Sequence, residues 1–210
     1  VEELSTRAQL YGRPMRTLAD ADAFRSIGLD RRAALWEVRR LPEDDPLPLF
    51  AHSETPELGP EADANLPEMG LGEQVATDYQ TMRLSLKAHP MALLRPAFAR
   101  EGVCSAAELA ARPDGHFTRM AGLVLVRQRP GKGNAIFITL EDETGITNCV
   151  LWARQFEALR HPVMAARLML VEGRVQKSKD GVAHLMASHV IDHSDALNLM
   201  WDAHRSGLAL

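Results

Sequence analysis

The second half of the chain contains five short, mainly apolar runs that are separated by a helical segment or by polar turns. The runs cover residues 119–127, 137–140, 147–152, 168–175 and 184–191. Short apolar runs with β-branched residues, bounded by turn residues, predict strands. Gly122 lies in the middle of the first run, where a glycine lets a long strand bend between two sides of a small barrel.

The hydrophobic spacing changes between the third run and the fourth. From Arg154 to Leu159, and on to Met164 and Ala165, apolar residues recur at helical spacing, which predicts a helix of about three turns. Three strands, a helix and two strands is the order of an OB-fold, a five-stranded barrel that commonly binds oligonucleotides. A generic small barrel gives a similar pattern and remains the alternative.

Residues 1–40 have the spacing of helices. We expect one helix over residues 18–26 and a second after Gly28, which together are typical of a helix-hairpin-helix motif. In that motif, backbone N–H groups near the second helix face a DNA phosphate without reading a base. Gly28 is the predicted contact, to which Arg31 and Arg32 add charge. Plain packing of a helical hairpin that turns on glycine is the alternative.

Residues 41–69 differ in composition from the rest of the chain. They hold six Pro and eight Asp or Glu but no Lys or Arg, which predicts an extended, self-repelling linker. An apolar island, Pro46 to Phe50, lies within it and includes Leu47 and Leu49. This island either packs onto the helical region or docks as a short linear motif in the groove of a partner.

Helical spacing returns in residues 70–111. Apolar residues from Leu71 to Leu86 recur every three or four positions, and the helix they predict ends before Pro90. A short helix over residues 105–111 then leads into the barrel. We therefore expect an α+β chain in five parts: 1–40, 41–69, 70–111, 112–193 and the tail 194–210.

Composition favours a soluble protein and a reducing compartment. Hydrophobic residues make up 46% of the chain, and no apolar run approaches the roughly 20 residues of a membrane span. Cys104 and Cys149 are isolated thiols without the spacing of a disulfide framework. Because Val1 is not an initiator Met, we expect a fragment of a longer protein.

The charge is distributed unevenly along the chain. The formal net charge is −4, and residues 1–111 hold 12 Lys or Arg against 18 Asp or Glu. Residues 112–193 hold 11 against 8, a balance of +3. Because only the predicted barrel is basic, it is the segment that suits phosphate binding.

Two predicted loops of the barrel concentrate cations. The loop between the first two strands carries Arg127, Arg129 and Lys132, followed by Asn134, and the loop between the last two carries Lys177 and Lys179. These are the loops that flank a bound strand in an OB-fold, and the phosphates of single-stranded DNA favour cations there. A solvated basic surface without a ligand is the alternative.

Alternation in the second strand indicates which side chains face outward. Phe137 and Thr139 lie on the face opposite Ile136, Ile138 and Leu140, so Phe137 is available for stacking on a base if the latter three fill the core. Trp152, at the end of the third strand, is a second candidate. A role in the core is the alternative for each ring.

No catalytic or metal-binding constellation is expected in this chain. Asp20 and Asp22 point to different faces of a helix, and Glu141–Glu143 are more simply explained as solvated turn formers. His184, His189 and His193 follow no zinc spacing, and no Cys pair lies near them. We expect no catalytic residue, metal or cofactor in this segment.

Longer stretches resemble a known family. Residues 21–36, 84–90, 122–130 and 137–145 resemble the C-terminal region of bacterial C-family (DnaE-type) DNA polymerases, and within it the error-prone, damage-tolerant branch. The resemblance implies a parent enzyme that extends primers with Mg²⁺ held by palm carboxylates, none of which lie in this chain. It also implies translesion synthesis in the bacterial cytoplasm, at the nucleoid.

The resemblance further implies partners. The helix-hairpin-helix unit is expected to lie against duplex DNA and the barrel to contact the single-stranded template. Leu47, Leu49 and Phe50 match the apolar positions of a motif that docks in the sliding clamp, although Pro46 replaces its usual Gln. Damage-tolerance accessory proteins are further expected partners. The competing hypothesis is a protein-interaction module in which the basic loops are incidental.

Overall fold

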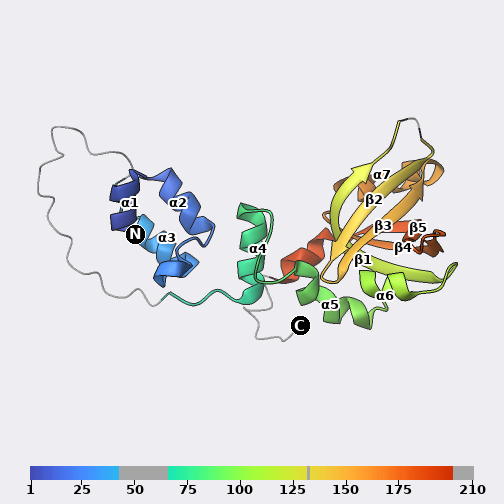
Figure 1. Cartoon of the computed structure of the whole chain (residues 1–210), viewed down its shortest axis with the longest axis horizontal. Coiled ribbons are helices and arrows are strands. Elements are labelled where there is room, and N and C mark those ends of the chain that lie inside the picture. The colour runs from blue at the N-terminus through green and yellow to red at the C-terminus, as the bar shows by residue number, and fades with distance from the viewer. Residues whose placement is uncertain (43–65, 132, 201–210) are drawn as a thin grey trace, which may run out of the picture. The chain divides into compact units, whose positions relative to one another are not determined.

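The fold is described from a computed structural model, which defines residues 1–42, 66–131 and 133–200. The chain forms two compact units. The first comprises Val1–Gly70 and Thr77–Leu84, and the second comprises Leu71–Ala76 and Ser85–Leu210. The predicted fold class, a helical region followed by a five-stranded β-barrel, is confirmed (Figure 1).

Short helices build the described part of the first unit. They are α1 (Glu2–Ala8), α2 (Arg13–Asp20), the 3₁₀ turn η1 (Arg25–Ile27) and α3 (Arg31–Val38). Their apolar sides meet in a small core of Met15, Ala19, Phe24, Ala34 and Val38. Burial of these side chains holds together helices that are too short to be stable alone.

The helix expected over residues 18–26 is placed differently in the structure. It begins at Arg13 and ends at Asp20, since α2 spans Arg13–Asp20. Pro14 favours this start because its fixed φ suits the first helical turn. Asp22 has a φ of 59°, in the left-handed region, so the α-helix cannot continue through it.

The predicted turn between helices is present at Gly28. This glycine has a φ of 84°, a conformation that side chains rarely adopt, and it directly follows η1. Asp30 then caps α3, because its side chain accepts a hydrogen bond from the Ala33 N–H at 2.8 Å. The local sequence therefore specifies both the turn and the start of the next helix.

The helix predicted to reach Leu86 is shorter than expected. It is α4 (Leu71–Thr81), and Arg83, with a φ of 66°, lies beyond its end in the left-handed region. Leu86 is 94% exposed and so contributes nothing to an apolar helix face. The prediction was too long because the helical spacing of apolar residues continues to Leu86, beyond the residue at which the backbone leaves the helix.

Two further helices precede the barrel. Pro90 begins α5 (Pro90–Arg100), a position where its missing N–H is no loss, and His89 caps the helix. The short helix expected over residues 105–111 is confirmed as α6 (Ala106–Ala111). It starts with a capping box between Ser105 and Glu108.

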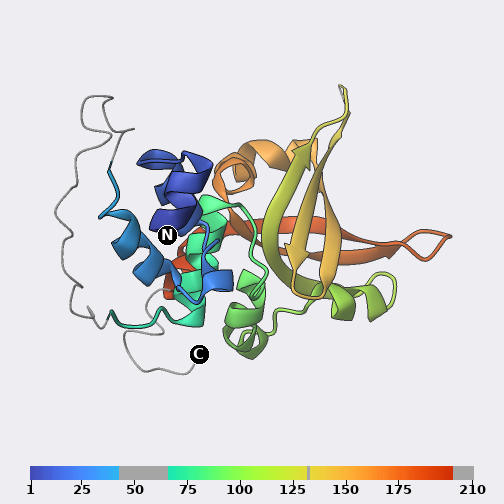
Figure 2. The same cartoon turned by 60° about the vertical axis from the view of Figure 1, so that its left-hand side comes forward.

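The barrel has the element order that the sequence predicts. Its parts are β1 (Phe117–Gln128), β2 (Ala135–Asp142), β3 (Gly145–Trp152), α7 (Ala153–Ala165), β4 (Leu168–Lys177) and β5 (Ala183–Asp192). The sheet closes in the order β1-β2-β3-β5-β4, with β3 and β5 parallel and the other pairs antiparallel. The helices α6 and α7 lie at opposite ends of this barrel (Figures 1 and 2).

Gly122 lies where the long first strand changes partner. Residues Phe117–Leu123 of β1 pair with β4, and Leu123–Gln128 pair with β2. A Cβ on Gly122 would lie 2.7 Å from the carbonyl oxygen of Glu141, closer than real side chains approach. The interpretation of this glycine as the bend between two sides of the barrel is consistent with the pairing.

The barrel interior is apolar, and α7 contributes to the same hydrophobic core. Ile138, Leu140, Leu151 and Leu185 have no exposed surface, and Val163 of α7 packs in the same cluster. After β5 the described chain ends in a 3₁₀ turn, η2 (Ser194–Asn198), and Met200. Among the described residues, no helix has the length and apolar character to cross a bilayer.

Candidate nucleic-acid interface

The side of the barrel formed by β1, β2 and β3 exposes aromatic and aliphatic side chains. Along β2 the inward residues Ile136, Ile138 and Leu140 are buried, whereas Phe137 is 38% exposed. The outward orientation predicted for Phe137 is therefore confirmed. A ring held outward by a rigid strand offers its face to a ligand without moving.

Strand pairing groups further side chains around Phe137. Phe137 lies opposite Gln128 of β1 and Val150 of β3, and Trp152 lies opposite Ala135. Val126, which pairs with Thr139, is 40% exposed, and Trp152 is 44% exposed. We call Val126, Phe137, Thr139 and Trp152 the outer face.

Thr139 supplies a polar group within this apolar surface. Its hydroxyl donates a hydrogen bond to the side-chain oxygen of Asn148, the residue opposite it on β3, at 3.0 Å. The hydroxyl oxygen keeps its capacity to accept a hydrogen bond. Thr139 therefore contributes to the outer face as an acceptor rather than as a free donor.

The cations predicted for the β1–β2 loop differ in their surroundings, and Arg127 lies within β1 rather than in the loop. Arg127 is half-buried and donates hydrogen bonds to the carbonyl oxygens of Val163 and Ala166, at the end of α7. Burial lowers the pKa of its guanidinium, opposed by the charge of Asp192, but an arginine stays protonated at neutral pH. Arg127 thus acts first as a cap for α7, which is a role that sequence reasoning missed.

Arg129 and Asn134 of this loop are exposed. Arg129 makes one local bond, from its Nε to the Gly133 carbonyl oxygen at 3.2 Å, so its terminal nitrogens can meet a phosphate. Asn134 lies at the base of the loop, next to β2. Lys132 lies outside the described residues, so its predicted contact is neither supported nor opposed.

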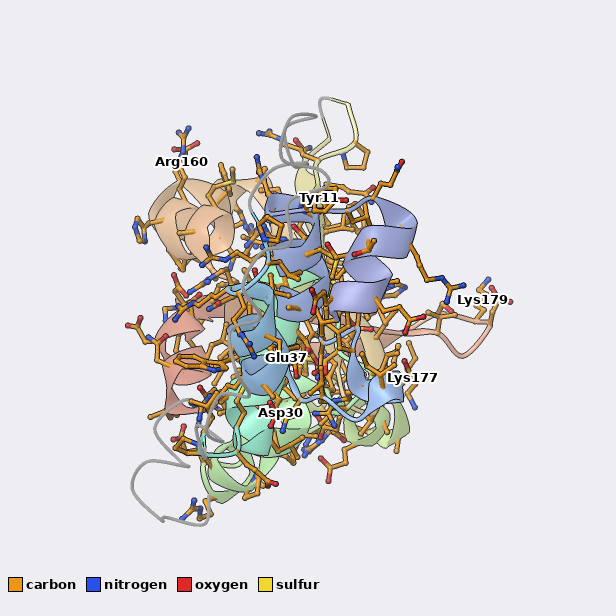
Figure 3. All side chains as sticks on the ribbon, turned by 90° about the vertical axis from the view of Figure 1, so that its left-hand side faces the viewer. Tyr11, Asp30, Glu37, Arg160, Lys177 and Lys179 are labelled. Atoms are coloured by element: carbon orange, nitrogen blue, oxygen red, sulfur yellow. The ribbon has the colours of Figure 1, made fainter. Side chains whose placement is uncertain are left out.

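The β4–β5 hairpin carries the second pair of predicted cations. Lys177 ends β4, and its backbone N–H donates to Asp114 at 2.9 Å, which fixes the base of the hairpin. Lys179 is exposed near the tip (Figure 3). The hairpin and the β1–β2 loop project from the barrel in different directions (Figure 2).

In the helical unit the predicted residues divide between surface and core. Gly28 is exposed in the turn before α3. Arg31 is only 4% exposed and forms an ion pair with Asp78, which is also buried. Arg32 donates to the carbonyl oxygen of Pro67. Because a phosphate contact requires an exposed cation, the burial of Arg31 argues against its predicted contact with DNA.

The acidic turn between β2 and β3 is structural, but it is not solvated as expected. Asp142 is buried, and its carboxylate accepts hydrogen bonds from Arg95 at 2.9 Å, from the Ala106 N–H at 2.7 Å and from Thr144. Glu143 also pairs with Arg95. The negative charge of this turn is thus balanced by Arg95, a partner more than 40 residues away that the local sequence does not reveal.

The carboxylates of Asp22 and Asp142 do not fit the Mg²⁺ that the resemblance implies for a parent enzyme. Magnesium is held by carboxylate oxygens that keep access to water and substrate phosphates. Those of Asp142 are occupied by backbone and arginine donors, and Asp22 pairs with Arg25. Across residues 1–42, 66–131 and 133–200, no group of three or more potential ligands is positioned to hold a metal ion.

A model of a nucleic-acid-binding family matches the barrel. The family is described as "OB-fold nucleic acid binding domain", and the match covers residues 118–192, from the start of β1 to the end of β5. The outer face and both basic loops lie within this match.

Curated relatives match nearly the whole chain. An error-prone DNA polymerase of Bradyrhizobium sp. (strain ORS 278) is 52% identical over 203 residues, which are 96% of this chain and 17% of the relative. One from Rhodopseudomonas palustris (strain ATCC BAA-98 / CGA009) is 54% identical over 92% of this chain and 17% of the relative. One from Brucella abortus biovar 1 (strain 9-941) is 48% identical over 94% of this chain and 18% of the relative.

The matches to solved structures cover less of the chain. An asparaginyl-tRNA synthetase from Pyrococcus horikoshii is 26% identical, with a TM-score of 0.36, over 42% of this chain and 22% of that one. OBody AM1L10, bound to hen egg-white lysozyme, is 16% identical, with a TM-score of 0.36, over 43% of this chain and 91% of that one.

Proposed function

We propose that this chain, which is homologous over nearly its whole length to a segment of error-prone DNA polymerases, holds single-stranded DNA on the outer face of its barrel. The chain spans 17–18% of the length of these relatives. Nucleotide transfer with Mg²⁺ is therefore proposed for the parent enzyme, and DNA holding without catalysis for this segment. The exposed row of Val126, Phe137 and Trp152 across three strands of an OB-fold carries the proposal.

The exposed rings of the outer face are suited to stacking on bases. Aromatic rings on adjacent strands stack on successive bases, and each stacked base contributes about 1–3 kcal/mol without selecting a sequence. Arg129 on one loop and Lys177 and Lys179 on the other provide cations for the phosphates. Binding through stacking and phosphate contacts does not depend on base sequence, so it is suited to a template strand of any sequence.

We extend the proposal to duplex DNA for the helical unit. Gly28 places the chain in an exposed turn just before α3, where backbone N–H groups approach a phosphate without obstruction from a side chain. A Cβ at this position would meet nothing within 4 Å, so the turn is open on its outer side. Binding there would position the duplex without reading its sequence.

Fluorescence anisotropy of labelled oligo-dT tests the barrel proposal. We expect Phe137→Ala to weaken binding about five- to hundredfold, the loss of one stacked base. The double variant Lys177→Ala/Lys179→Ala should also bind more weakly and respond less steeply to salt. Arg160→Ala is the control, since Arg160 is an exposed cation on α7 (Figure 3) and is not one of the outer-face residues.

Two results would contradict the proposal. One is a chain that fails to bind oligo-dT even at low salt. The other is binding that Phe137→Ala and Arg160→Ala reduce equally, because the outer face would then contribute nothing beyond general charge.

Docking to a sliding clamp or to accessory proteins is the alternative function. Its candidate residues, Leu47, Leu49 and Phe50, lie outside the described residues, so the motif stays a prediction from sequence. A pull-down with the clamp, comparing the chain with a Leu49→Ala/Phe50→Ala variant, tests it. Apolar docking of this kind should persist at salt concentrations that abolish phosphate binding.

A further inference from the structure

We propose that the pocket at the junction of β3 and α7 binds one nucleotide of the strand, with the base against Trp152 and its phosphate at Arg154. This inference rests on the proposed function. The inference also states where the bound DNA strand leaves the outer face, namely at the start of α7. Arg154 is thereby assigned a role in binding that neither its position in the sequence nor the family match provides.

The pocket is formed by residues of the loop, the strand end and the helix start. Among the described residues it is lined by Asn134, Trp152, Ala153 and Arg154. The Ala153 N–H donates to the carbonyl oxygen of Asn134 at 2.7 Å. This backbone bond fixes the base of the β1–β2 loop to the start of α7, so the lining residues are held together before a ligand arrives.

Three chemically different side chains line this pocket without partners of their own. Trp152 is 44% exposed. It is the N-cap residue of α7, but its side chain makes no capping hydrogen bond. Asn134 and Arg154 are exposed, and their side chains have no hydrogen bond or ion pair within the described parts of the chain. An indole face, an amide and a guanidinium match a base, its polar edge and a phosphate.

The pocket is continuous with the outer face. Trp152 pairs with Ala135, two residues before Phe137 on β2, which makes Trp152 and Phe137 diagonal neighbours on the sheet. Diagonal neighbours lie about 7–8 Å apart. Consecutive nucleotides of an extended strand span such a gap, so the same strand can place one base on Phe137 and the next on Trp152.

Local charge also favours a phosphate beside Arg154. The first turn of α7 contains no acidic residue. The one acid on this helix, Glu157, lies beside Arg160, with 3.9 Å between the charged atoms. The charge of Arg154 is therefore not neutralised by its own helix.

The first test compares two arginines on the same helix. Oligo-dT binding to the full chain is measured by anisotropy at several salt concentrations for Arg154→Ala and Arg160→Ala, which remove the same charge. We expect Arg154→Ala to weaken binding at least about fivefold and to flatten the log–log salt dependence by about 0.7, the contribution of one phosphate of a single strand. Arg160→Ala should change affinity less than about twofold.

The second test reports on the pocket itself. The indole N–H resonance of Trp152, assigned with Trp152→Phe, is followed by NMR during titration with dTMP or thymidine. We expect dTMP to shift this resonance at lower concentration than thymidine, and Arg154→Ala to abolish that difference. Because Arg154 is exposed, the variant should keep the wild-type midpoint of thermal unfolding.

The outcomes separate this inference from the function on which it rests. If Phe137→Ala weakens oligo-dT binding while Arg154→Ala matches Arg160→Ala, the pocket assignment is wrong and the proposed function stands. Equal responses of Trp152 to dTMP and thymidine also overturn the assignment. If the wild-type chain binds no oligo-dT at low salt, both fail.

Discussion

Phe137 and Ile138 are adjacent in β2 but face opposite sides of the barrel wall. Ile138 has no exposed surface, whereas Phe137 lies on the outer face. We expect Ile138→Ala to lower the free energy of unfolding by about 2–5 kcal/mol, because it leaves a cavity in the core. Phe137→Ala should cost less than half as much. Urea denaturation measures both, and equal losses would show that Phe137 belongs to the core.

Cys149 is a buried thiol whose chemistry depends on the fold. Burial raises its pKa from 9.0 to about 12, because the barrel interior disfavours the thiolate. The thiolate is the reactive form, so the folded chain should protect Cys149 from oxidation and alkylation.

Thiol labelling checks this protection. In a Cys104→Ser variant, native protein at pH 8 should react with a disulfide reagent far more slowly than protein in concentrated urea. The same shift makes stability depend on alkaline pH. Its contribution is complete below pH 9 and is lost as the pH rises towards about 12, because the unfolded state releases the proton first. Labelling that does not respond to urea would contradict this account.

At the scale of elements, one arginine joins α5 to the turn between β2 and β3. Arg95 contacts Asp142 and Glu143, and Asp142 also accepts from the N–H of Ala106 at the start of α6. Two helices are thereby attached to the same end of the barrel. These contacts connect positions 36 to 48 residues apart in the sequence.

Removing Asp142 should therefore weaken the attachment of both helices. Asp142→Ala leaves Arg95 and a backbone N–H with fewer acceptors, and we expect a loss of about 2–4 kcal/mol in the free energy of unfolding. Glu157→Ala removes an exposed carboxylate from α7 and should change stability by less than about 0.5 kcal/mol. Chemical denaturation followed by circular dichroism compares them, and equal midpoints would exclude a structural role for the Asp142 contacts.

At the scale of the whole molecule, charge is segregated between segments. The net charge of −4 conceals a barrel segment with a balance of +3. Binding of DNA should therefore depend on this segment and be sensitive to ionic strength, because each phosphate contact releases a counterion.

This segregation predicts how affinity changes with salt. For oligo-dT, three or four phosphate contacts give a log–log slope of about −2 to −3. The Lys177→Ala/Lys179→Ala variant should have a slope smaller in magnitude by about 1 to 1.5, as expected for the loss of two contacts. Affinity that is independent of salt would favour apolar docking of a protein partner over DNA binding.

Local sequence patterns were enough to predict the barrel and its inward and outward faces. Alternation is a local property, since successive side chains of a strand point to opposite sides, so Phe137 and Ile138 could be assigned before any strand pairing was known. The change of period after Trp152 likewise identified α7. Helix ends in the first unit were less well predicted, because left-handed residues such as Asp22 and Arg83 end helices without a glycine or proline signal.

Which charged residues are available to a ligand depends on the tertiary fold. Arg31, Arg127 and Asp142 each follow a plausible local pattern, but each has a partner in a segment 36 or more residues away. Such pairs depend on how the chain folds back on itself, which periodicity does not encode. Arg154 was missed for a related reason, because the pocket that it lines forms only where Asn134, at the base of the β1–β2 loop, meets the start of α7.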